Sequence, residues 1–151
     1  MAGSVKVRDA SALLSEVYRN VRMAEESIID LMPKVTEERL KSMLTVQISV
    51  YSAFSSRAAK QLAEAGVKPE EENAVTKLGA KWGILMNTLR DSTQEHLVQM
   101  LIEGTTMGVG ELLRVIRDAQ NNGIGGEPLC LASDLLAYEE QAVEEMKGYL
   151  R

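Results

Sequence analysis

Residues 14–31 read LSEVYRNVRMAEESIIDL, and the spacing of their apolar side chains decides the fold class. Apolar residues recur alternately every third and fourth position, which places them on one face of an α-helix. The members of this set are Leu14, Val17, Val21, Ala24, Ile28 and Leu31. A helix with one apolar face must bury that face against a partner. The segment therefore predicts an amphipathic helix that belongs to a bundle.

A second and a third helix follow the same pattern. Pro33 ends the first helix, and Thr36, followed by two acidic residues, begins the second, which ends near Gly66. Pro69 opens the third helix. The inward positions of the second helix are Leu40, Leu44, Tyr51, Phe54, Ala58 and Leu62, with Gln47 as a polar interruption. Those of the third are Val75, Leu78, Trp82, Leu85 and Leu89.

Two further helices complete the chain. Ser92 with Glu95 three residues later matches a capping box and predicts the start of the fourth helix. Pro128, after a glycine-rich loop, opens the fifth. The inward positions of the fourth helix are Leu97, Leu101, Leu112, Val115 and Ala119, and those of the fifth are Leu131, Leu135, Ala142, Met146 and Tyr149. No alternating β-branched segment is left to form a strand.

Composition agrees with a single all-α domain over residues 1–151, with residues 1–8 as a flexible N-terminus. Only 4% of the residues are aromatic, and eight are methionine, which suits aliphatic helical cores. The net charge of -5 disfavours binding to nucleic acid or to an anionic membrane. Cys130 is the single cysteine, and no apolar stretch is long enough to span a bilayer. We therefore expect a cytoplasmic protein that is not integral to a membrane.

The length of the third helix indicates a topology. About 22 residues span roughly 33 Å, which is almost one bundle length. Such a helix can act as a long crossover that returns the chain to the other end, so that the fourth helix runs parallel to the second. A plain up-and-down bundle of five helices is the alternative that the same periodicities allow.

Three segments resemble an uncharacterised bacterial family of small ferritin-like proteins. They are KLGAKWGILMNTL (residues 77–89), HLVQMLIEGTTMG (residues 96–108) and LLAYEEQAVEEMK (residues 135–147), and the similarity extends over about residues 10 to 150. The resemblance implies an all-α fold, a ferritin-like four-helix bundle with an additional long crossover helix between helices two and four. It also implies metal binding as an inherited possibility.

The sequence departs from the ligand pattern of carboxylate-bridged di-iron sites. Such sites need a Glu-x-x-His pair on each of two helices, whereas the corresponding stretches here read QISV (residues 47–50) and EQAV (residues 140–143). We therefore expect no intact di-iron site and no cofactor. The alternative is a divalent metal held by a non-standard set of carboxylates. Its candidate ligands are Glu25, Glu26, Glu103, Glu139, Glu140 and His96.

Several single residues have two interpretations. We expect His96 to be a partly exposed residue of a helix start, with a role as a base or lone ligand as the alternative. Cys130 is expected to be buried, with a thiolate sensor as the alternative. Gln47 is expected to be a satisfied polar residue of the core, or else a ligand contact. Gly104, Gly108 and Gly110 predict close approach of a neighbouring helix, to seat Trp82, with a helix kink or a break that accommodates a ligand as the alternative.

The usual enzyme signatures are absent from the sequence: it has no phosphate-binding loop, no Ser/His/Asp set and no Cys/His cluster. The favoured interpretation is therefore a non-catalytic, self-associating protein with no catalytic residue. The alternative is a ferritin-like metal-binding or oxidoreductase protein. A homodimer is expected because apolar residues extend beyond the main seams, with cover by the crossover helix, through Trp82 and Leu85, as the alternative. The residues beyond the seams are Val46 and Val50 of the second helix, and Val98, Met107 and Ile116 of the fourth.

Overall fold

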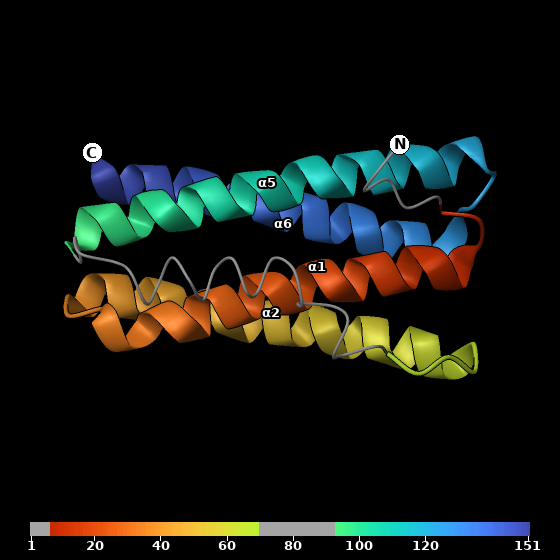
Figure 1. The fold of residues 1–151 in the computed structure, drawn as a ribbon, viewed down its shortest axis with the longest axis horizontal. Coiled ribbons are helices and arrows are strands. Elements are labelled where there is room, and N and C mark those ends of the chain that lie inside the picture. The colour runs from red at the N-terminus through yellow and green to blue at the C-terminus, as the bar shows by residue number, and fades with distance from the viewer. Residues whose placement is uncertain (1–6, 70–92) are drawn as a thin grey trace.

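The computed structural model describes residues 7–69 and 93–151. Within these ranges the chain forms α1 (Ala10–Leu31), a short 3-10 turn η1 (Met32–Lys34), α2 (Glu38–Glu64), α5 (Gln94–Asn121) and α6 (Gly126–Leu150), and no strand (Figure 1). The expected all-α class is confirmed. In this described part of the chain, no helix combines the length and apolarity needed to cross a membrane.

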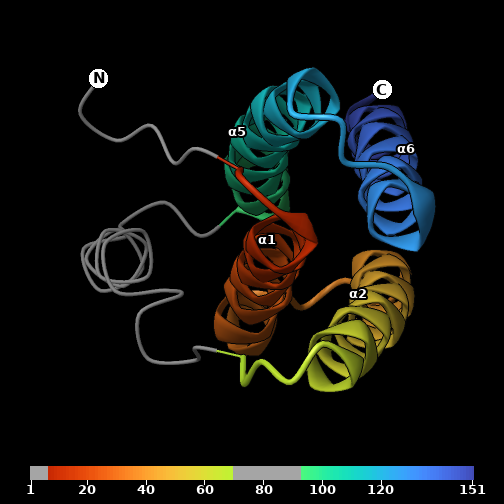
Figure 2. The same ribbon diagram turned by 90° about the vertical axis from the view of Figure 1, so that its right-hand side faces the viewer.

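The four helices pack side by side as a bundle. α1 contacts α2, α5 and α6, and α6 also contacts α5 and α2, while α2 and α5 lie at opposite corners when the bundle is viewed along its length (Figure 2). α1 and α6 are each antiparallel to α2 and α5, and α5 runs parallel to α2 (Figure 1). Both expected topologies require this parallel direction. The third helix with Trp82, which distinguishes a crossover from an up-and-down bundle, lies outside the described residues.

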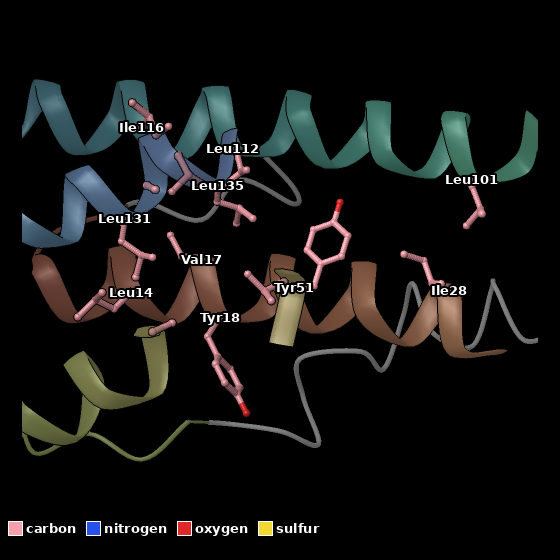
Figure 3. Close-up of a cluster of buried hydrophobic side chains, with 14 of the residues drawn as sticks. Leu14, Val17, Tyr18, Ile28, Tyr51, Leu101, Leu112, Ile116, Leu131 and Leu135 are labelled. Atoms are coloured by element: carbon pink, nitrogen blue, oxygen red, sulfur yellow. The ribbon is translucent and has the colours of Figure 1, made fainter. Parts of the chain in front are cut away.

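The apolar seams form the core. Most residues expected to face inward are buried, and a group of them between the helices is shown in Figure 3. Ala24, Phe54 and Tyr149 are only partly buried. Val98 and Ile116, expected to lie on the outside of α5, are 0% and 9% exposed and belong to the core. That prediction was wrong because α5 contacts both α1 and α6, and two neighbours require a wider apolar face than one.

The helix starts differ slightly from the expected ones. Asp9 caps α1 by accepting a hydrogen bond of 2.8 Å from the Ala12 backbone N–H. Thr93, rather than Ser92, caps α5, because its hydroxyl accepts from the backbone N–H of His96. Glu37, rather than Thr36, occupies the N-cap position of α2. The expected boundaries were thus displaced by one residue at two of the helix starts.

Side-chain contacts join the helix ends. The backbone N–H of Thr36 donates to Gln94 Oε1 over 3.0 Å, which ties the start of α2 to the start of α5. Val7, which falls within the expected flexible start, is buried, and its carbonyl accepts from Asn122 Nδ2 over 2.7 Å. Gly66, with a φ of 75°, follows the last turn of α2 as expected for a C-cap glycine.

Candidate functional site: a polar centre in the bundle

Three polar atoms inside the bundle make no hydrogen bond with the described part of the chain. They are Oδ1 of Asn20 on α1, the hydroxyl oxygen of Tyr51 on α2 and Oε1 of Glu139 on α6. Buried polar atoms in native proteins are nearly always paired, and each unpaired one costs about 1–3 kcal/mol. Unpaired polar atoms from three different helices are therefore a feature that calls for a functional explanation.

Glu139 lies against a glycine of the facing helix. A Cβ placed on Gly108 of α5 would be 3.2 Å from Glu139 Oε1 and 3.7 Å from Oε2. At 3.2 Å the contact with a Cβ would be tighter than normal van der Waals contact, so any larger residue at this position would require the carboxyl group to shift. The group that the structure places against Gly108 is thus a carboxyl group, whereas the expectation was the close approach of a helix that seats Trp82. Gly104 is exposed, and Trp82 lies outside the described ranges.

Asn20 approaches the same glycine from α1. Its Nδ2 donates a hydrogen bond of 3.1 Å to the backbone carbonyl of Gly108 and lies 3.6 Å from the position of the Cβ that Gly108 lacks. Because only the NH₂ group can donate to a carbonyl, this bond fixes the orientation of the amide. The unpaired atom of Asn20 is consequently an oxygen, a hydrogen-bond acceptor.

Tyr51 contributes from α2. Its side chain is 1% exposed, and its ring packs edge-on against Tyr138, with 5.4 Å between the ring centroids. Figure 3 shows the ring between the ribbons of α1 and α5, with the hydroxyl directed toward α5. Burial, together with the charge of Glu139, raises the pKa of Tyr51 well above its usual range. The hydroxyl is therefore neutral and is close enough to interact electrostatically with Glu139.

Glu139 is the one carboxyl group among these residues. It is 1% exposed, and burial raises the pKa of Glu139 from its usual 4.5 to about 8. Asn20, Tyr51, Gly108 and Glu139, one residue from each helix, are called the polar centre below. In helical bundles, inward side chains from facing helices are what form ligand and metal sites.

The candidate metal ligands expected from the sequence are not brought together. Glu25 and Glu26 both pair with Arg22, at 2.9 and 3.0 Å. Glu103 and Glu140 are exposed, and His96 lies half-buried in the first turn of α5, as expected. Of these candidates only Glu139 belongs to the polar centre. Across residues 7–69 and 93–151, no three His, Cys, Asp or Glu side chains are grouped to hold a metal ion.

Two further expectations have opposite outcomes. Gln47 is buried and donates to Glu145 Oε1 over 3.3 Å, so it has a partner within the bundle, as expected. Cys130 is exposed, and the expectation of a buried thiol was wrong. The reason lies in the helix geometry of α6, where Leu131 and Ala132 take the inward positions and the preceding residue turns outward.

Sequence reasoning missed the roles of Asn20 and Tyr51 and named Glu139 only as one of several candidate metal ligands. One signal was available, since Glu139 follows the buried Leu135 by four residues and therefore continues its apolar seam.

Comparison of the chain with family models, with curated proteins and with solved structures found no match.

Proposed function

We propose that this chain is a ferritin-like helical-bundle protein that binds a small polar ligand at its polar centre and has no di-iron chemistry. The observation that carries the proposal is the set of three unpaired, buried oxygen atoms on three helices. A ligand that bonds to them would recover part of the cost of leaving them unpaired, which is about 1–3 kcal/mol for each atom.

The ferritin-like part of the proposal rests on the resemblance of three sequence segments, and the arrangement of the helices is compatible with it. Two antiparallel pairs, α1 with α2 and α5 with α6, pack together with α2 and α5 parallel, as an up-and-down bundle would also have them (Figure 1). Ferritin-like bundles place their ligand-binding side chains at inward positions of all four helices, as the polar centre does. Here those positions carry one carboxyl group, an amide, a phenol and a glycine.

Binding is favoured over acid–base catalysis by the chemistry of these groups. The amide of Asn20 does not titrate, and the phenol of Tyr51 has a pKa raised well above its usual range. General acid–base catalysis is most efficient when the pKa of the catalytic group lies near the working pH. Only Glu139 meets that condition within the polar centre.

A panel of small solutes tests the proposal. The thermal midpoint of the full chain is measured against sodium, potassium, magnesium, calcium and manganese salts and against neutral amides and alcohols. At least one solute is expected to raise the midpoint in a saturable way. Glu139→Leu is expected to abolish this rise, while Glu140→Leu, on the exposed side of α6, retains it. If no solute separates the two variants, the polar centre is a structural network only.

Self-association is a second candidate property, favoured by exposed apolar residues. Val46 on α2 and Met107 on α5 are 60% and 62% exposed, and Ile29 and Leu113 are also exposed. A second copy of the chain would cover part of this surface, and a two-fold homodimer is the commonest closed assembly.

We further propose the cytoplasm as the location, because an exposed, single cysteine is compatible with reducing conditions.

A further inference from the structure

The three unpaired atoms of the polar centre share one chemical property. A carboxyl oxygen, an amide oxygen and a phenol oxygen all carry lone pairs. One N–H of the Asn20 NH₂ group is bonded to the carbonyl of Gly108. The centre therefore presents three oxygen atoms with free lone pairs, one of them on a carboxyl group, and such a set suits a hard cation better than an anionic ligand.

The charge of the centre limits the charge of its ligand. Glu139 supplies at most one negative charge, since Asn20 does not ionise and the pKa of Tyr51 is raised well above its usual range. A net charge is costly to bury, so a fully enclosed site favours a neutral combination of ligand and protein. One carboxylate with a monovalent cation is neutral, whereas a divalent cation would leave a positive charge in the core.

The protein's own cations near Asn20 are engaged elsewhere. Arg19 pairs with Glu16 at 2.7 Å, and Arg22 pairs with Glu25 and Glu26. The pKa of Glu139 is raised by burial, with no opposing contribution from a positive side chain. The carboxyl group thus has no counter-charge from the described part of the chain.

The polar side chains of the centre are close neighbours. Glu139 Oε1 and Asn20 Nδ2 lie 3.2 and 3.6 Å from the same point, where a Cβ on Gly108 would stand, and the enclosed Tyr51 interacts electrostatically with Glu139. We propose that the polar centre binds one small monovalent cation of the sodium class through Asn20 Oδ1, the Tyr51 hydroxyl oxygen and Glu139 Oε1. This inference rests on the proposed function and names its ligand.

The experiment compares sodium chloride with choline chloride at equal ionic strength and one fixed pH, using the full chain. Sodium is expected to raise the thermal midpoint in a saturable way and to broaden the sodium-23 NMR line, while choline does neither. Glu139→Gln, which keeps the shape of the side chain, abolishes both effects. Asn20→Ala weakens sodium binding by at least about tenfold, because it removes a direct ligand. Glu140→Gln, an exposed neighbour on the same helix, behaves as the parent chain.

The outcomes separate this inference from the proposed function. If magnesium, calcium or a neutral solute binds in a Glu139-dependent way and sodium does not, the monovalent cation is ruled out while ligand binding at the centre stands. If no solute acts through Glu139, and a high-resolution crystal structure grown from sodium salt shows only water at the centre, both proposals fail.

Discussion

Glu139 of α6 lies directly over Gly108 of α5, with its Oε1 3.2 Å from the point where a Cβ on that glycine would stand. The two residues are complementary: the missing side chain makes room for the carboxyl group, and the carboxyl group fills the space beside the helix backbone. Asn20 closes the arrangement by donating to the Gly108 carbonyl over 3.1 Å. A substitution at Gly108 therefore acts on the polar centre itself.

Gly108→Leu is expected to destabilise the protein by about 2 kcal/mol or more, because the added side chain must displace Glu139 and Asn20. The matched control is Gly110→Ala in the same helix, where a Cβ would meet nothing within 4 Å. That change should stabilise by up to about 1 kcal/mol, since alanine is the better helix former. Urea denaturation of the two variants measures the difference. Equal stability would show that the contact at Gly108 is not restrictive.

A substitution at Gly123, a glycine that follows this helix, would not be a suitable control for Gly108→Leu. Its φ is 73°, a conformation that alanine adopts only with strain, so Gly123→Ala loses stability for a local backbone reason. Gly104, by contrast, is exposed, whereas Gly108 is partly buried. The two glycines, similar in sequence context, are expected to differ in their tolerance of leucine.

The buried carboxyl group of Glu139 predicts a pH dependence of stability. Burial raises its folded-state pKa from 4.5 to about 8, so that above pH 4.5 the unfolded chain ionises this group before the folded chain does. The stability that the protonated group gives is fully present below pH 4.5 and is lost as the pH rises towards 8. The loss approaches about 1.4 kcal/mol per pH unit in that range.

Urea denaturation at pH 5, 7 and 9 in sodium-free buffer measures this dependence. The free energy of unfolding should fall across the series in the parent chain and in Glu140→Gln, whose substituted side chain is exposed. In Glu139→Gln the fall should be much smaller, because glutamine has no charge to bury. A variant with the same slope as the parent would show that another group controls the pH dependence.

Neighbouring leucines on α5 test the assignment of the core. Leu112 is 1% exposed and Leu113 is 49% exposed. Leu112→Ala is expected to cost about 2–5 kcal/mol because it leaves a cavity, and Leu113→Ala is expected to change stability by no more than about 0.5 kcal/mol. Thermal or urea denaturation of both variants decides. Similar losses would mean that α5 is rotated about its axis relative to this arrangement.

The inward faces could be predicted from the sequence because helix geometry alone determines which side chains share a face. Leu112 and Val115 were assigned in this way. The helix geometry could not tell how many neighbours α5 has, and so Ile116 was placed outside. The polar centre depends on the register between helices, since Asn20, Tyr51 and Glu139 come from distant parts of the chain. No local pattern records that register, although the position of Glu139 within an apolar seam was a usable sign.

The exposed apolar residues lead to a prediction about association. Val46 is 60% exposed in the first half of α2, and a contact with a second copy would remove it from water. We expect sedimentation at micromolar concentration to give a species heavier than the 16.6 kDa chain. Val46→Glu should shift this species towards the monomer, because a buried, unpaired carboxylate opposes association.

A matched change on another helix identifies the face involved. Gln141 is exposed on α6, and Gln141→Glu adds the same charge away from α2. If the dimer uses α2, it withstands Gln141→Glu and is lost in Val46→Glu, while the helical content of both variants equals that of the parent chain. Met107→Glu extends the test to α5, where the exposed fraction of the side chain is 62%. Loss of the dimer with Met107→Glu but not with Val46→Glu would place the contact on α5. If the parent chain itself sediments as a monomer, the homodimer hypothesis is rejected, because the three variants can only weaken a dimer that the parent chain forms.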